Sequence, residues 1–201
     1  KLGIELAEGK YEDEYKAGKL TYLFIGKKGY DYLKNRVPGA ILNTEYMNIV
    51  GKTFGFEDSS KVASELMADF EAEKYDSIDI VYAQFKNAAV QNFTVEPFLP
   101  VAKLEVAEDG VDENADFIFE PNKEELLEYL VPTILKTQLH KTILDSNASE
   151  QGARMTAMEN ATENAEDLLK ELKINYNKAR QEAITAEISE IVGGVAALED
   201  A

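Results

Sequence analysis

Residues 148–198 have the sequence ASEQGARMTAMENATENAEDLLKELKINYNKARQEAITAEISEIVGGVAAL. The stretch contains no proline, and its apolar residues recur every three or four positions, the spacing that keeps side chains on one face of an α-helix. After an offset of one residue a second stripe replaces the first, which indicates a local change of supercoil. We therefore predict a long helix whose apolar face is the seam of a coiled coil. The first stripe is Met158, Ala161, Ala165, Leu168, Leu172, Tyr176, Ala179 and Ala183, and the second is Ile184, Ile188, Ile191, Val195 and Leu198.

The helical pattern begins well before this stretch, at Lys123, and apolar residues continue it through Ile143. A single helix over residues 123–198 would be roughly 110 Å long at 1.5 Å per residue. A domain of this size cannot bury such a rod, so its protruding half requires a partner helix, an enclosing assembly, or both. We accordingly predict a partial α/β globular domain at residues 1–121 and a shaft helix at residues 122–201.

The part upstream of the helix alternates short β-rich segments with helical ones, which is typical of α/β folds. Strands are predicted at residues 20–26, 40–42, 77–85 and 94–104, and a helix at residues 30–35. A longer helix is predicted to begin at Asp58, with Asp58 or Ser59 as its cap. Pro97 and Pro100 place the last strand at a sheet edge. The predicted fold is therefore a small, incomplete, Rossmann-like doubly wound sheet followed by the long helix.

Several fixed words occur within the helical stretch: SEQ-x-ARM-x-AM at residues 149–158, AT-x-NA at 161–165, YN-x-x-RQ at 176–181 and IT-x-EI-x-EIV-x-G at 184–194. Together they resemble the carboxyl end of the gamma subunit of F-type ATP synthase. Weaker matches in the same order are IGKKGYDYL at residues 25–33 and FIFEPNKEELLEYLVP at 117–132. The resemblance thus covers most of the chain.

Gamma subunits begin with a long helix that pairs antiparallel with the carboxyl-terminal one. The first strand of the central domain follows, with a TSDRGL-like motif. Neither feature occurs here, and the chain begins at Lys1. We therefore expect an amino-terminally truncated fragment whose long helix is half of an antiparallel coiled coil.

The resemblance implies a non-catalytic rotor subunit in the central stalk, without a cofactor of its own. It would couple proton translocation to ATP synthesis or hydrolysis on the beta subunits. The implied partners are the alpha and beta subunits of the catalytic hexamer, the epsilon subunit and the c-ring of the membrane sector. The implied location is peripheral to an energy-transducing membrane on its ATP-synthesising side, at the cytoplasmic face of a bacterial plasma membrane or its mitochondrial or plastid counterpart.

The word YNKARQEAIT contains the residues that the resemblance assigns to contact with a partner. In gamma subunits the Arg-Gln pair, here Arg180 and Gln181, lies where the shaft touches a loop of a beta subunit. Arginine and glutamine side chains both bridge to carboxylates and backbone carbonyls. Thr185 and Glu187 are expected as further members of this contact.

Composition limits the other classes of function. The chain has 201 residues, is 45% hydrophobic, and carries a formal net charge of -17, which argues against nucleic acid or anionic lipid as its main partner. No run approaches the roughly 18 apolar residues of a membrane-spanning helix. The absence of cysteine excludes disulfides, thiol catalysis and cysteine-based metal sites within these 201 residues. Residues 103–129 are strongly acidic, and we expect a solvated loop and helix start there.

Other motifs give weak signals. GKT at residues 51–53 lacks the glycine that a P-loop requires five residues earlier, where Tyr46 stands. Gly26 and Gly29 could hold a phosphate but are more typical of a turn between strand and helix. His140, the single histidine, is predicted to have a packing role on a helix face or a surface role rather than to catalyse. Two alternatives stay open: an α/β enzyme acting on a phosphorylated ligand, and a coiled-coil scaffold that associates with itself.

Overall fold

A computed structural model describes residues 1–51, 54–101 and 122–199. The chain divides into two compact units, Lys1–Glu150 and Gln151–Ala201, which are described separately below. The expected end of the fourth strand, at residues 102–104, most of the acidic stretch at 103–129, and two residues of the GKT motif lie outside the described residues.

The first unit begins with two short helices, α1 at Leu2–Glu8 and α2 at Glu12–Lys16. A βαβ element follows, composed of β1 at Thr21–Leu23, α3 at Lys27–Leu33 and β2 at Ile41–Asn43. β1 and β2 are parallel, with Thr21 opposite Ile41 and Leu23 opposite Asn43. Gly26 precedes α3 with a φ of 119°, a conformation that side chains with a Cβ rarely adopt. The two predicted strands and the helix between them are present, although α3 begins three residues before the predicted start at residue 30 and ends at Leu33 rather than at residue 35.

Helix α4 extends over Phe56–Glu71 and begins two residues before the predicted start. The sequence suggested Asp58 or Ser59 as the cap, but the capping residue is Gly55. Asp58 still serves the helix end, because its Oδ2 accepts a hydrogen bond of 3.0 Å from the backbone N–H of Gly55. This is the return bond of a capping box, in which the third helical residue binds the capping residue. The cap prediction was therefore wrong in position, although Asp58 stabilises the same helix end.

Strands β3 at Ile78–Phe85 and β4 at Gln91–Leu99 form an antiparallel hairpin in which Val81 is opposite Val95. Asn87 stabilises the connecting turn, since its side-chain oxygen accepts from the backbone N–H groups of Ala89 and Val90. Within the described residues β4 pairs with β3 alone, which agrees with the edge position predicted from its prolines.

The predicted α/β class with a long carboxyl-terminal helix is confirmed, but the sheet differs in detail from a doubly wound one. The described strands form two separate ladders of two strands each, β1–β2 and β3–β4, and only the first is parallel. Strand direction is set by which segments pair, and the alternation of β-rich and helical segments does not specify that pairing.

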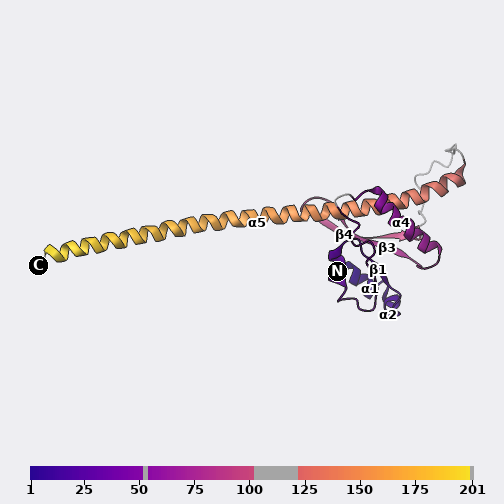
Figure 1. The fold of residues 1–201 in the computed structure, drawn as a ribbon, viewed down its shortest axis with the longest axis horizontal. Helices are drawn as coiled ribbons and strands as arrows, with labels where there is room; N and C mark the ends of the chain where they lie inside the picture. The colour runs from indigo at the N-terminus through magenta and orange to yellow at the C-terminus, as the bar shows by residue number, and fades with distance from the viewer. Residues whose placement is uncertain (52–53, 102–121, 200–201) are drawn as a thin grey trace, which may run out of the picture. The chain divides into compact units, whose positions relative to one another are not determined.

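Helix α5 comprises Lys123–Glu199 and begins where the sequence predicted. Asn122 caps it in a reciprocal way: its Oδ1 accepts from the backbone N–H of Glu125, and its Nδ2 donates to the Glu125 carboxylate, each at 2.8 Å. The helix supplies one side of the core of the first unit, and α4 lies beside it (Figure 1). The buried members of this core are Val62, Ala63, Phe98, Leu99, Leu135, Leu139 and Ile143.

This packing explains why the compact units divide at Glu150 rather than at the predicted boundary of residues 121 and 122. The turns of α5 that carry Leu135, Leu139 and Ile143 are part of the globular core. Farther along the helix, the buried hydroxyl of Ser149 donates a hydrogen bond of 2.9 Å to the backbone carbonyl of Ala83 in β3. The change in structural role therefore occurs within α5, well after the change in sequence pattern.

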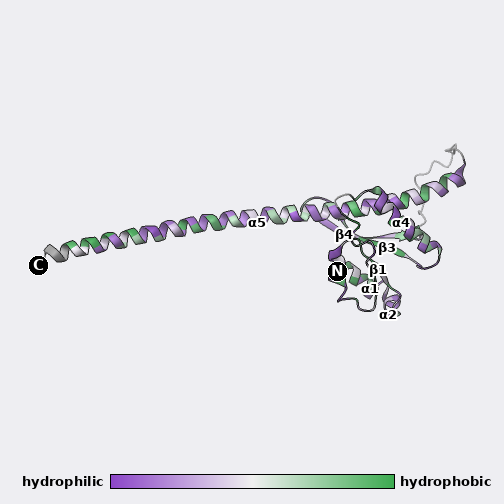
Figure 2. Ribbon diagram, viewed as in Figure 1, coloured by the Kyte–Doolittle hydropathy of each residue, from purple (hydrophilic) through white to green (hydrophobic). Residues whose placement is uncertain are grey.

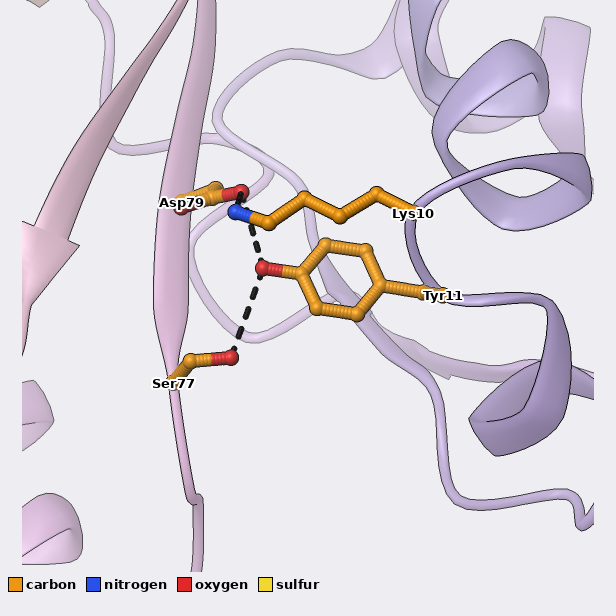
Figure 3. Close-up of polar contacts among 4 residues, drawn as sticks. All are labelled: Lys10, Tyr11, Ser77 and Asp79. Atoms are coloured by element: carbon orange, nitrogen blue, oxygen red, sulfur yellow. Dashed lines mark hydrogen bonds and ion pairs between the residues drawn. The ribbon is translucent and has the colours of Figure 1, made fainter.

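A polar cluster attaches the amino-terminal helices to β3 (Figure 3). The Oδ2 atom of Asp79, whose side chain is 7% exposed, accepts from Lys10 Nζ at 2.6 Å and from the Tyr11 hydroxyl at 2.8 Å. The hydroxyl of Tyr11 also lies 3.3 Å from that of Ser77. The hydrogen bond to Asp79 raises the pKa of the Lys10 ammonium above its ordinary value. The cluster connects segments almost seventy residues apart, and sequence periodicity gave no indication of it.

Candidate interaction surface

The second unit, Gln151–Ala201, contains the carboxyl-terminal part of α5, up to Glu199, and it exposes nearly all of its described side chains. Every side chain from Ala157 to Val195 is exposed. The exposed fractions of the large apolar side chains from Met158 onward run from 47% at Ile184 to 68% at Tyr176. Figure 2 shows apolar and hydrophilic residues alternating along this helix. Extended apolar surface of this kind marks an interaction site.

The two predicted stripes lie on different sides of the helix. At 3.6 residues per turn, the eight residues of the first stripe fall within an arc of roughly 80°. The four seam residues from Ile184 to Val195 fall within an arc of roughly 60°, rotated by about a third of a turn from the first. Half of the first stripe is alanine, whereas the four seam residues from Ile184 to Val195 are isoleucine and valine. The helix therefore presents first a face that mixes alanines with larger residues, and then a face of β-branched residues on another side nearer its end.

The four predicted contact residues are exposed, and they divide into two pairs around the helix. Arg180 and Glu187 lie within roughly 20° of each other beside the first stripe, while Gln181 and Thr185 lie on a side rotated by roughly 130°. The hydroxyl of Thr185 donates a hydrogen bond of 2.8 Å to the backbone carbonyl of Gln181. One flat partner cannot reach both pairs, so the four residues suit either two neighbours or one that wraps around the helix.

The alternative phosphate site at Gly26 faces a cavity of about 260 Å³ in the first unit. The cavity lining includes Ile25, Ile80, Leu139 and the carboxylate-bearing Glu150, and none of the lining residues within the described part of the chain is a lysine or arginine. An apolar wall with a carboxylate does not attract a phosphate. The described geometry around this turn therefore gives no support to the phosphate-enzyme hypothesis.

Tyr82 also lines this cavity, and its phenol is held in the neutral form. Burial, together with a hydrogen bond of 2.5 Å to the Glu96 carboxylate, raises the pKa of Tyr82 to about 12. A neutral phenol donating to a carboxylate is a structural contact between β3 and β4. It is not the arrangement of an activated base.

The described part of the chain lacks two further kinds of feature. Among these residues, no group of three or more histidine, cysteine, aspartate or glutamate side chains is arranged to hold a metal ion. Likewise, none of the described helices has a segment both long and apolar enough to cross a bilayer.

Comparison with known proteins identifies the class to which this fold and helix belong. A family model described as ATP synthase matches residues 4–198, nearly the whole chain. The ATP synthase gamma chain of Cytophaga hutchinsonii is 44% identical over 202 residues, a match that covers 100% of this chain and 67% of that protein. The gamma chain of Flavobacterium johnsoniae is 48% identical over 197 residues, which covers 96% of this chain and 66% of that protein.

The chain therefore belongs to the ATP synthase gamma chain family, as its sequence motifs indicated. It spans about two thirds of the length of these relatives. Among solved structures, a chain of the Euglena gracilis mitochondrial ATP synthase, in an assembly titled OSCP/F1/c-ring, is similar with a TM-score of 0.55 at 22% identity. That match covers 90% of this chain and 62% of the Euglena chain, and it supports the fold.

Proposed function

We propose that this chain is the rotor subunit in the central stalk of an F-type ATP synthase. It would couple proton translocation to ATP synthesis or hydrolysis by rotation. The observation that carries the proposal is the exposed apolar surface from Met158 to Val195 on a helix that has no covering element among the described residues. Family membership supports it, because the relatives are named as gamma chains. A surface of this kind is stable in water only when another chain or segment covers it.

Catalysis is assigned to the beta subunits, and this chain is proposed to act on them mechanically. The two stripes face different directions, so the helix presents a different surface to each subunit around it. A ligand changes a conformational equilibrium only through different affinities for the states involved. A helix with unlike sides meets that requirement, since equivalent neighbours touch unlike faces and are held in different states.

The seam is proposed to receive a second helix in an antiparallel coiled coil. Its four alanines, Ala161, Ala165, Ala179 and Ala183, would allow the partner backbone to approach closely. The leucines between them would fill the gaps. The bulkier stripe from Ile184 to Val195 is proposed to meet a wider, enclosing surface. Its β-branched side chains are stiff and lose little rotamer freedom when they become buried.

The contact with the beta subunits is proposed to include Arg180, Gln181, Thr185 and Glu187. Their division into two pairs supports an enclosing partner rather than a single flat one. The remaining proposed partners are the alpha subunits along the shaft, with the epsilon subunit and the c-ring at the α/β unit. With these partners the chain would be peripheral to an energy-transducing membrane, on the side where ATP is made.

The test is assembly with alpha and beta subunits, in the presence of the segment that the relatives have beyond the matched region. The expected result is a complex that retains this chain through gel filtration and hydrolyses ATP. Arg180→Ala combined with Gln181→Ala should lower hydrolysis in that complex. The matched control is Lys178→Ala combined with Glu182→Ala, because both residues lie on the side away from the two stripes. Equal effects of the two double variants would contradict the proposed contact.

The scaffold hypothesis predicts a different result in the same preparation. A self-associating coiled coil would form a stable dimer through its own apolar stripe and would not bind the alpha and beta subunits. Sedimentation of the chain alone and in the mixture distinguishes the two. Failure to join the complex would refute the rotor assignment.

A further inference from the structure

The junction between α4 and α5 contains an interaction that the rotor assignment does not use. Ser59 on α4 is fully buried, and its Oγ lies 2.9 Å from Nδ1 of His140 on α5. The same Oγ donates to the backbone carbonyl of Phe56, also at 2.9 Å. The contact between Ser59 and His140 is a side-chain hydrogen bond that joins α4 directly to α5. It lies beside the apolar core that the two helices share.

The hydrogens in this junction can be counted. A serine hydroxyl has one hydrogen to donate and two lone pairs that accept. If that hydrogen is directed at the Phe56 carbonyl, the imidazole nitrogen facing Ser59 must donate. If it is directed at His140 instead, the Phe56 carbonyl and Ser59 Oγ lie 2.9 Å apart without a hydrogen between them, an unfavourable contact in a buried position. Both contacts are satisfied only when Nδ1 of His140 carries a hydrogen.

Two aromatic rings fix the orientation of the imidazole. The ring of Phe54 stacks on it, with centroids 5.7 Å apart and planes at 22°. The ring of Phe56 meets it at 82° with centroids 5.4 Å apart. Both arrangements are favourable for aromatic pairs. These contacts hold the plane of the imidazole, and the hydrogen bond to Ser59 directs Nδ1 towards α4.

We infer that His140 is a positioning residue that fastens α5 to α4 beside their shared core. In this role its imidazole is the tautomer that carries a hydrogen on Nδ1. The fastening is a property of this chain alone. Its consequence for transmitting torque from the α/β unit to the helix rests on the proposed function. The tests below use the isolated chain, so their outcome does not depend on whether the chain is a rotor.

The first test is nitrogen NMR of the intact 201-residue chain labelled with ¹⁵N in histidine. His140 is the single histidine, so its two imidazole signals are assigned without variants. Under alkaline conditions, where an imidazole is neutral, Nδ1 should show the shift of a protonated nitrogen and Nε2 that of a bare one. The reverse pattern, or averaged shifts from a freely exchanging ring, would overturn the inference.

The second test uses two neighbouring serines on α4. Ser59→Ala removes the acceptor and should release the imidazole to the other tautomer or to a mixture. Ser60→Ala is the matched control, because the Ser60 hydroxyl is buried without a hydrogen-bond partner in the described structure. The control should leave the nitrogen shifts unchanged. If Ser59→Ala leaves the Nδ1–H pattern intact, the serine does not select the tautomer.

The third test separates the hydrogen bond from simple ring packing. His140→Phe keeps an aromatic ring but loses the donor, while His140→Asn places an amide donor near the position of Nδ1. Amide hydrogen exchange around residue 140 should be about fivefold to tenfold faster in the phenylalanine variant, from a loss of about one hydrogen bond. The asparagine variant should restore part of the protection. Equal exchange in the wild type and the phenylalanine variant would overturn the fastening role.

Discussion

Two leucines on the same helix should lose very different amounts of stability on the same substitution. Leu139 is 3% exposed within the core formed by α4, β4 and α5, whereas Leu172 in the second unit is 55% exposed. Leu139→Ala removes buried methyl groups and leaves a cavity, which costs about 2–5 kcal/mol of unfolding free energy. Leu172→Ala removes contacts mainly with water and should change the stability of the isolated chain by no more than about 0.5 kcal/mol.

The assay is urea unfolding of the isolated chain followed by tyrosine fluorescence, which reports on the first unit through residues such as Tyr82. The midpoint should fall clearly for Leu139→Ala and stay near the wild type for Leu172→Ala. In the assembled complex, Leu172→Ala should weaken binding to the partner subunits more than Leu139→Ala does, because Leu172 belongs to the proposed seam. Comparable losses of unfolding free energy from both variants in the isolated chain would refute the division of α5 into a segment packed in the core, around Leu139, and an uncovered shaft.

Three further predictions concern the first unit. Asp79→Ala leaves the Tyr11 hydroxyl without its charged acceptor and should cost about 1–3 kcal/mol, measured by thermal unfolding; a melting temperature equal to the wild type would contradict the cluster's role. The pKa of Tyr82 is raised to about 12 by burial and by its glutamate partner, so its contribution to stability is complete below about pH 10 and is lost as pH rises towards 12; Tyr82→Phe should flatten the decline in stability over that range, and an unchanged decline would exclude this group as its cause. Asp58→Ala removes the acceptor for the Gly55 N–H at the start of α4 and should cost about 0.5–2 kcal/mol in urea unfolding, whereas no change would show that the return bond is not formed in solution.

Much of the architecture could be predicted from local pattern. The spacing of apolar residues located α5, and the β-rich segments located all four described strands. The errors concern properties that local pattern does not determine. The start of α4 was misplaced because Gly55, which has no capping side chain, precedes an aspartate that resembles a cap. The sheet also differs in detail from a doubly wound one, because strand direction depends on which distant segments pair.

Prediction of the site depended on different information. The stripes gave the faces of the shaft, and the family motifs supplied Arg180 and Gln181, but neither shows what covers them. The packing role predicted for His140 agrees with its place between Phe54 and Phe56. Its hydrogen bond to Ser59 joins residues that are 81 positions apart, so neither helical nor strand periodicity in the sequence indicates it. The Asp79 cluster was missed for the same reason.

The measurement that tests the central claim most directly is rotation of this chain within an assembled complex. The chain contains no cysteine, so Glu8→Cys on the exposed side of α1 provides a single site for an optical probe. With immobilised alpha and beta subunits and added ATP, the account predicts that the probe rotates in one direction while ATP is hydrolysed. A complex that hydrolyses ATP while the probe on this chain remains stationary would contradict it.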